Sequence, residues 1–147
     1  MKLQPLMTTD FDNLNIKGFL GAYAKDIAPK LKIGQSCVLN LENINGPTNG
    51  SHWVYICNKK ENFCYFDSYA VTPSETTKRK MIKRKRCIFN NTQVQRLEDS
   101  ICCGHLCVYV AKMLEKGHSF SDVMFSFSLN TDENEKMIER WWGSFKK

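Results

Sequence analysis

The apolar pattern of residues 103–114 is the strongest constraint on the fold. Apolar side chains recur there at steps of four and three residues, at Cys103, Cys107, Val110, Ala111 and Leu114. This spacing predicts a long helix with one apolar face, and Gly117 is typical of a residue that ends a helix. Such a face has to be buried against another layer of structure, so the rest of the chain must supply that layer.

Short apolar runs in the middle of the chain predict strands. Residues 37–41 form one run, and residues 43–50 after it are rich in Asn, Gly and Pro, which predicts a loop. Residues 52–57 and 63–67 form two more runs, joined by five polar residues, and predict a hairpin. Residues 86–90 predict a further strand, and residues 72–85 before it could begin as a helix at Thr72 or Ser74. For the first 35 residues we expect short helical or irregular pieces.

Two further elements follow the long helix. Residues 120–127 predict a short element, and Asn130 with Glu133 fits the start of a last helix. That helix would dock through Met137, Ile138, Trp141 and Trp142. Strands in the middle with helices at the ends indicate an α+β fold, with a small, mostly antiparallel sheet and helices packed around it.

Length and composition favour one globular domain. The chain has 147 residues, of which 42% are hydrophobic, so it can bury a core, and we expect a single domain over residues 1–147 and a monomer. No apolar run reaches the roughly 20 residues that a membrane span needs, and no signal-peptide pattern opens the sequence. The seven cysteines, an odd number, are therefore expected to be reduced thiols inside a cell.

A histidine, an aspartate and a cysteine of the sequence could together form one catalytic site. His52 begins one predicted strand and Asp67 ends the next, so an antiparallel hairpin would bring the two side chains together. Cys103 lies in the first turn of the long helix, where the helix dipole favours a thiolate. His52 would activate Cys103 as a nucleophile while Asp67 holds the imidazole in its productive orientation.

Acyl transfer also requires hydrogen-bond donors for the developing oxyanion. The backbone N–H of Cys103 can supply one, and the side-chain amide of Gln95 can supply a second, with Gln93 as the alternative. Gly104 follows the cysteine and would leave room for a substrate backbone. Together these residues predict an activated cysteine nucleophile equipped for acyl transfer.

Four segments carry a resemblance to a known family. Gly50-Ser51-His52-Trp53-Val54, Tyr65-Phe66-Asp67-Ser68-Tyr69, Gln95 and Asp99-Ser100-Ile101-Cys102-Cys103-Gly104 resemble the adenovirus-type (adenain-like) maturation proteases, which share a clan with ubiquitin-like-protein proteases. The proteases of Maverick/Polinton elements and virophages are the most similar subgroup. The resemblance spans about residues 11–135, with three departures: Ala70 stands where the subgroup usually has Gly, Cys102 is an extra cysteine, and Gln95 lies eight positions before Cys103.

The resemblance implies roles and partners. It implies His52 as general base, Asp67 as orienting acid, Cys103 as nucleophile and Gln95 as oxyanion donor. It also implies a narrow channel roofed by Trp53 that admits glycine residues of the substrate. The expected function is a viral thiol protease of capsid maturation that cuts capsid or core precursor proteins at Gly-Gly or Gly-X sites, in the host cytoplasm or virus factory and in the virion. The alternatives are removal of a ubiquitin-like modifier, or an inactive packaging protein that binds nucleic acid.

Two other uses of the cysteines have to be weighed. Cys102 is the rival nucleophile, but it lies about 100° around the helix from the apolar face. Zinc could use Cys102, Cys103, His105 and Cys107, although the paired Cys-x-x-Cys spacing of closed zinc sites is missing. We therefore expect no metal site, and no cofactor for the chemistry itself.

The positive charge is concentrated in one segment. Seven of the 21 basic residues lie in residues 78–86, namely Lys78, Arg79, Lys80, Lys83, Arg84, Lys85 and Arg86. Such a run is often a solvated face, but it also favours a polyanionic partner. Because no aromatic residue interleaves the run, stacking on bases is not indicated, and the expected binding is non-specific and salt-sensitive. The family resemblance points the same way, to DNA as an activator. We expect the segment to become ordered with its partner.

Overall fold

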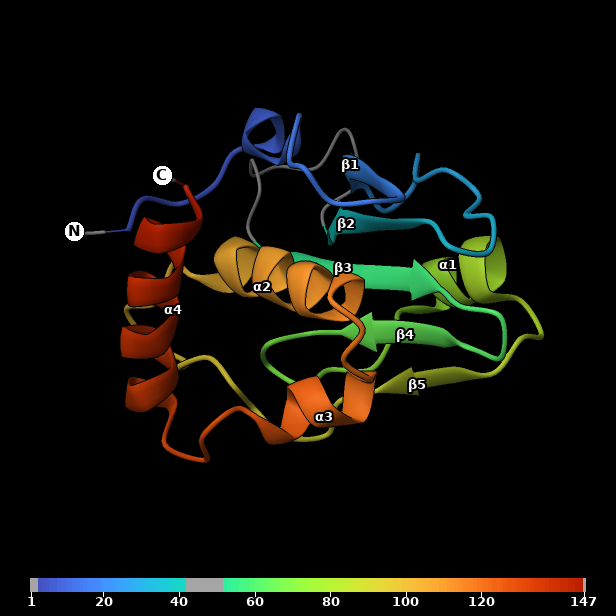
Figure 1. Cartoon of the computed structure of the whole chain (residues 1–147). Coiled ribbons are helices and arrows are strands. Elements are labelled where there is room, and N and C mark those ends of the chain that lie inside the picture. The colour runs from blue at the N-terminus through green and yellow to red at the C-terminus, as the bar shows by residue number, and fades with distance from the viewer. Residues whose placement is uncertain (1–2, 42–51, 147) are drawn as a thin grey trace.

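A computed structural model describes residues 3–41 and 52–146. The predicted loop at residues 43–50 lies outside these residues. A five-stranded sheet forms the centre, in the order β1 (Phe19–Ala24), β2 (Ser36–Asn40), β3 (Trp53–Asn58), β4 (Phe63–Phe66), β5 (Cys87–Phe89). Helix α2 (Cys103–Glu115) lies across one face of this sheet (Figure 1). The α+β class predicted from the sequence is confirmed.

The sheet is mixed. β2/β3 and β3/β4 are antiparallel, and the latter is the predicted hairpin, whereas β1/β2 and β4/β5 are parallel. Parallel neighbours need crossover connections. The connection from β4 to β5 contains α1 (Glu75–Thr77) and the helical turn η2 (Lys78–Ile82), with Ser74 as N-cap. The expectation of a mostly antiparallel sheet is therefore right for the two inner pairings and wrong for the outer two.

Strand β1 corrects the expectation for the first 35 residues. The segment Phe19–Ala24 pairs with β2, and the register shifts between Phe19 and Ala22. Gly21 lies in that interval with φ of 106°, a backbone conformation that side chains rarely adopt. This irregular edge strand has no clear alternation of buried and exposed residues, which is why the periodicity did not reveal it. The preceding turn η1 (Thr8–Phe11) is helical, as expected.

Both faces of the sheet are covered. Trp53, Tyr55 and Cys57 of β3 point into the core shared with α2, whereas Val54 and Ile56 point into a second core on the opposite face. All six residues of β3 are consequently buried, which explains its continuous apolar run. The second core also contains Met81 and Ile82 of η2, so part of the basic segment is anchored in the fold.

Helices α3 (Phe120–Phe125) and α4 (Thr131–Phe145) complete the domain. Asn130 caps α4 by accepting a hydrogen bond from the N–H of Asp132. Ile138 and Trp142 are buried, as the docking face required. Helix α4 stands at the end of the sheet where α2 begins, near both chain termini, while α1 lies at the far end (Figure 1). Within the described residues, no helix combines the length and the apolar character needed to cross a membrane.

Candidate active site

His52 and Asp67 meet at one edge of the hairpin. His52 immediately precedes β3 and Asp67 immediately follows β4, and the antiparallel register pairs Tyr55 with Phe66. His52 Nε2 lies 2.7 Å from Asp67 Oδ1. The predicted contact between the two side chains is thus confirmed, and it leaves Nδ1 of the imidazole for another partner.

Asp67 is held by its own turn and by a distant asparagine. Its side chain is buried, and Oδ1 also accepts the backbone N–H of Tyr69 at 2.8 Å. Asn90 Oδ1 accepts the N–H of Asp67 at 3.1 Å, and Asn90 Nδ2 donates to the Asp67 carbonyl at 2.7 Å. The Tyr69 ring stacks on the His52 ring, with centroids 4.7 Å apart. Together these contacts fix both the carboxylate and the imidazole plane.

Sequence reasoning assigned no role to Tyr69 or Asn90. Tyr69 stood inside a segment that carried the family resemblance, so its position was a usable signal. Asn90 was only the end of a predicted strand, 23 residues from Asp67. Its role arises from the parallel pairing of β4 with β5, which the sequence did not reveal.

The surroundings of His52 favour the imidazolium. Burial alone would lower its pKa, but the hydrogen bond to Asp67, the nearby Cys103 thiol and the charges of both groups raise the pKa of His52 from 6.5 to about 9. A cation beside the thiol stabilises its thiolate.

The structure brings Cys103, and not Cys102, to His52. Cys103 is the first residue of α2, where the free backbone N–H groups and the helix dipole favour negative charge. Cys102 is the N-cap residue, and its thiol points to Glu135, with Sγ 3.2 Å from Oε2. Burial, together with the Glu135 carboxylate, raises the pKa of the Cys102 thiol well above its usual range. Of the two neighbouring thiols, Cys102 is thus paired with a carboxylate, whereas Cys103 lies near the His52 imidazole.

Gln95 is buried close to this helix start. Its Oε1 accepts the Ser68 hydroxyl at 2.5 Å, and its Nε2 donates to Ser100 Oγ at 2.8 Å. Gln93 uses its amide differently, because its Nε2 donates to the Gln95 carbonyl at 2.7 Å and shapes the loop. The amide of Gln95, and not that of Gln93, is thus attached to the segment that leads into Cys103.

Trp53 and Gly104 lie beneath the N-terminal segment. Trp53 is only 3% exposed, its Nε1 donates to the Leu6 carbonyl at 3.2 Å, and its ring packs on Phe11. A Cβ on Gly104 would come within 3.0 Å of Phe11 and 3.2 Å of Trp53. The space beside Gly104 is therefore filled by packed side chains, which is a structural reason for glycine, and Trp53 has a structural role whatever it does for substrate.

The basic segment is ordered by the protein itself, contrary to our expectation that ordering needs a partner. Met81 and Ile82 anchor it, Lys80 Nζ donates to the Asp26 carbonyl, and Lys85 Nζ donates to Asn58 Oδ1 at 2.6 Å. The remaining basic side chains of this segment are exposed: Lys78, Arg79, Lys83, Arg84 and Arg86. They lie at the far end of the sheet, because Asn58 is the last residue of a strand whose six residues span roughly 20 Å.

The two remaining side chains of the possible zinc site, Cys107 and His105, each contact a different tryptophan residue. The Cys107 thiol donates to the Trp53 carbonyl, and the His105 ring packs edge-on against Trp142 at 4.7 Å. Among residues 3–41 and 52–146 no three potential ligands converge on a metal site. All seven cysteines, each in the described part of the chain, are free thiols.

Comparisons with known proteins add a fold-level likeness. No protein-family model matches the chain, and no curated protein matches it. Two solved structures of the ASFV pS273R protease are similar, with 21% and 20% sequence identity and a TM-score of 0.48 each. They cover 69% and 71% of this chain, but the chain covers only 40% and 42% of theirs. The geometry of the site, rather than this likeness, carries the function proposed below.

Proposed function

We propose that this protein is a cysteine endopeptidase in which Cys103 is the nucleophile, His52 the acid and base, and Asp67 the orienting acid. One observation carries the proposal: His52 Nε2 lies 2.7 Å from Asp67 Oδ1, and Cys103, at the start of a 13-residue helix, is near enough to the same imidazole to raise its pKa. A nucleophile beside a base that an orienting group holds in place is the arrangement that nucleophilic catalysis needs.

The geometry supports a two-step acyl transfer. The Cys103 thiolate attacks the carbonyl carbon of the scissile bond, and the oxyanion receives hydrogen bonds from the Cys103 N–H and the Gln95 amide. The His52 imidazolium then protonates the leaving amine, and a thioester remains on Cys103. In the second step His52 takes a proton from water, which attacks the thioester and releases the acyl product as the free acid.

For the substrate, we propose viral capsid or core precursor proteins cut at Gly-Gly or Gly-X sites. The resemblance of the His52, Asp67 and Cys103 segments to adenain-like proteases supports this choice. Incubation of the protein with precursor proteins from its own source, followed by mass spectrometry of new termini, would identify the cut sites. A ubiquitin-like modifier fused through its Gly-Gly tail, supplied in parallel, tests the deconjugation alternative.

Two matched variants test the nucleophile. Cys103→Ala should abolish cleavage while the fold remains, since the side chain is small and lies at a helix start. Cys102→Ala should keep most of the cleavage, because the Cys102 thiol faces Glu135 and not His52. Cleavage by Cys103→Ala that survives repeated purification would refute the proposed mechanism, and loss of cleavage only in Cys102→Ala would move the nucleophile.

The exposed basic side chains support a second proposal, non-specific binding of DNA at the end of the sheet far from His52. Replacement of Arg79, Lys83, Arg84 and Arg86 with Gln should weaken duplex binding and flatten its salt dependence, by about 0.9 in the log–log slope for each phosphate that the variant no longer neutralises. Wild-type protein that shows no affinity for duplex DNA at about 50 mM salt, where phosphate contacts dominate, would remove this proposal. Cleavage assays with and without DNA then test whether the DNA activates the enzyme.

A further inference from the structure

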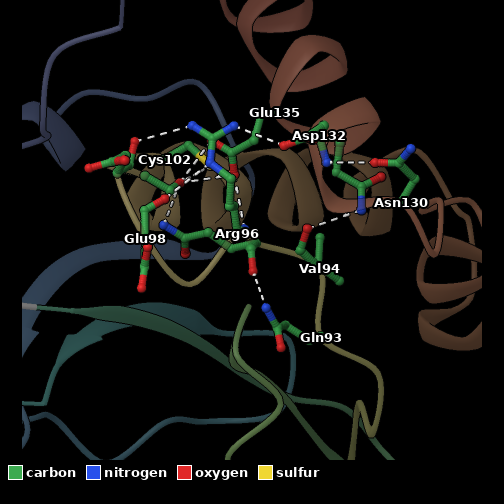
Figure 2. Close-up of polar contacts among 12 residues, drawn as sticks. Gln93, Val94, Arg96, Glu98, Cys102, Asn130, Asp132 and Glu135 are labelled. Carbon is green, nitrogen blue, oxygen red and sulfur yellow. Dashed lines mark hydrogen bonds and ion pairs between the residues drawn. The ribbon is translucent and has the colours of Figure 1, made fainter.

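Helix α4 holds the loop that leads into the proposed nucleophile. Figure 2 shows Asp132 and Glu135 of this helix beside Arg96 of the loop. Asp132 binds Arg96 at 2.9 Å, Asn134 donates to the Val94 carbonyl at 3.0 Å, and Glu135 binds the end of the loop. The first turns of α4 therefore hold this loop through polar contacts at several points.

Glu135 makes the most concentrated of these contacts. Its carboxylate accepts the Ser100 hydroxyl, with Oγ 2.8 Å from Oε1 and 2.9 Å from Oε2. Oε2 also lies 3.2 Å from Cys102 Sγ and accepts a hydrogen bond from the backbone N–H of Arg96 at 3.3 Å. One carboxylate therefore ties together both sides of the loop immediately before Cys103.

A series of hydrogen bonds runs from Glu135 through Ser100 to Gln95, and only one assignment of donors and acceptors satisfies all of them. A serine hydroxyl has one proton, and a carboxylate only accepts, so Ser100 donates to Glu135. Ser100 Oγ can then only accept from Gln95, which places Nε2 of the amide, and not Oε1, toward Ser100 at 2.8 Å. At the other end, Oε1 of Gln95 accepts the Ser68 hydroxyl. The amide orientation of Gln95 follows from the carboxylate two hydrogen bonds away.

We propose that Glu135 is a positioning residue that fixes the Gln95 amide with its N–H groups toward the oxyanion site, an inference that rests on the proposed peptidase function. One Nε2 proton is used by Ser100, and the second is left for the oxyanion. If Ser100 were free to donate to Gln95 instead, the amide could turn and present a carbonyl oxygen, which would repel the oxyanion. A charge-assisted hydrogen bond is strong enough to hold this order.

Kinetics of matched variants test the inference. Glu135→Gln should lower kcat by about 10- to 100-fold, up to the loss expected when one oxyanion donor is removed, and leave KM nearly unchanged. Glu133→Gln, an exposed glutamate on the same helix, should change neither. Alkylation of Cys103 by iodoacetamide forms no oxyanion, so its rate should be the same in all three proteins. An unchanged kcat in Glu135→Gln overturns the proposal.

A double-mutant comparison separates positioning from a general structural effect. If Glu135 acts through Gln95, the variant Gln95→Ala/Glu135→Gln should turn over no more slowly than Gln95→Ala alone. Losses that multiply instead would overturn the proposal. Should Glu135→Gln fail to fold, Ser100→Ala interrupts the same chain and should give the same kcat loss and the same lack of additivity.

A measurement on the resting protein keeps the test independent of turnover. In ¹H–¹⁵N spectra, the side-chain amide signals of Gln95, assigned from Gln95→Ala, should shift in Glu135→Gln and not in Glu133→Gln. Signals that do not move overturn the positioning role. If they move as expected but wild-type protein cleaves no peptide bond, the proposed peptidase function fails while the control of the amide by Glu135 stands.

Discussion

The raised pKa of His52 depends on Asp67, and this dependence can be measured directly. Burial opposes the imidazolium, and Asp67 is the largest of the influences that favour it, ahead of Cys103. Asp67→Asn keeps the shape of the side chain and an oxygen for the Tyr69 N–H, but removes the charge. We therefore expect the pKa of His52 to fall from about 9 to 6.5 or below.

The expected change in the free energy of unfolding follows from the pKa shift of His52. A difference of about 2.5 between the folded and unfolded pKa corresponds to about 3 kcal/mol of stability. Because the folded pKa is the higher one, this contribution is fully present below pH 6.5 and is lost as pH rises through about 9. Asp67→Asn should thus be destabilised by about 3 kcal/mol in mildly acidic solution and by much less above pH 9. Turnover should fall by orders of magnitude as the imidazole loses its orientation.

The assay is an NMR titration of the three histidines, with the His52 signal assigned from His52→Gln, alongside chemical denaturation at several pH values. Cys103→Ala is the matched control, because it should lower the pKa of His52 by less than Asp67→Asn does. If His52 in Asp67→Asn still titrates near 9, or if the wild-type histidine titrates near 6.5, the electrostatic account of the site is refuted.

Three further outcomes concern stability, each measured by denaturant unfolding. Trp53→Ala should cost about 3–5 kcal/mol because the ring is buried, and Trp53→Phe about 1 kcal/mol for the lost bond to Leu6; a wild-type midpoint in both would contradict its packed role. Ala70 has φ of 62°, so Ala70→Gly should stabilise by about 0.5–1 kcal/mol, and a loss of stability would argue against backbone strain there. Burial lowers the pKa of His105 to about 4, so this histidine should remove about 2 kcal/mol of stability between neutral pH and pH 5, and His105→Leu should lose that much less than wild-type protein; parallel curves would refute this.

Local sequence patterns determined most of the elements, though not β1, and the central pair of the site. The step pattern of residues 103–114 located α2 and put Cys103 at its first position, and the two apolar runs around residues 58–62 located the β3/β4 hairpin. In an antiparallel hairpin the start of the first strand lies beside the end of the second. The contact between His52 and Asp67 therefore followed from their positions in the sequence. These features depend on residues near one another in the chain.

Only the tertiary structure decided what surrounds that pair. Asn90 reaches Asp67 through a parallel strand pairing, Glu135 reaches Ser100 from a helix 35 residues away, and Leu6 covers Trp53 across 47 residues. No periodicity or motif in the sequence predicts the partner of any of these residues, because a single polar side chain can bind many different neighbours equally well. Their partners are chosen by how the crossover and the last helix pack, and the burial of the whole core selects that packing.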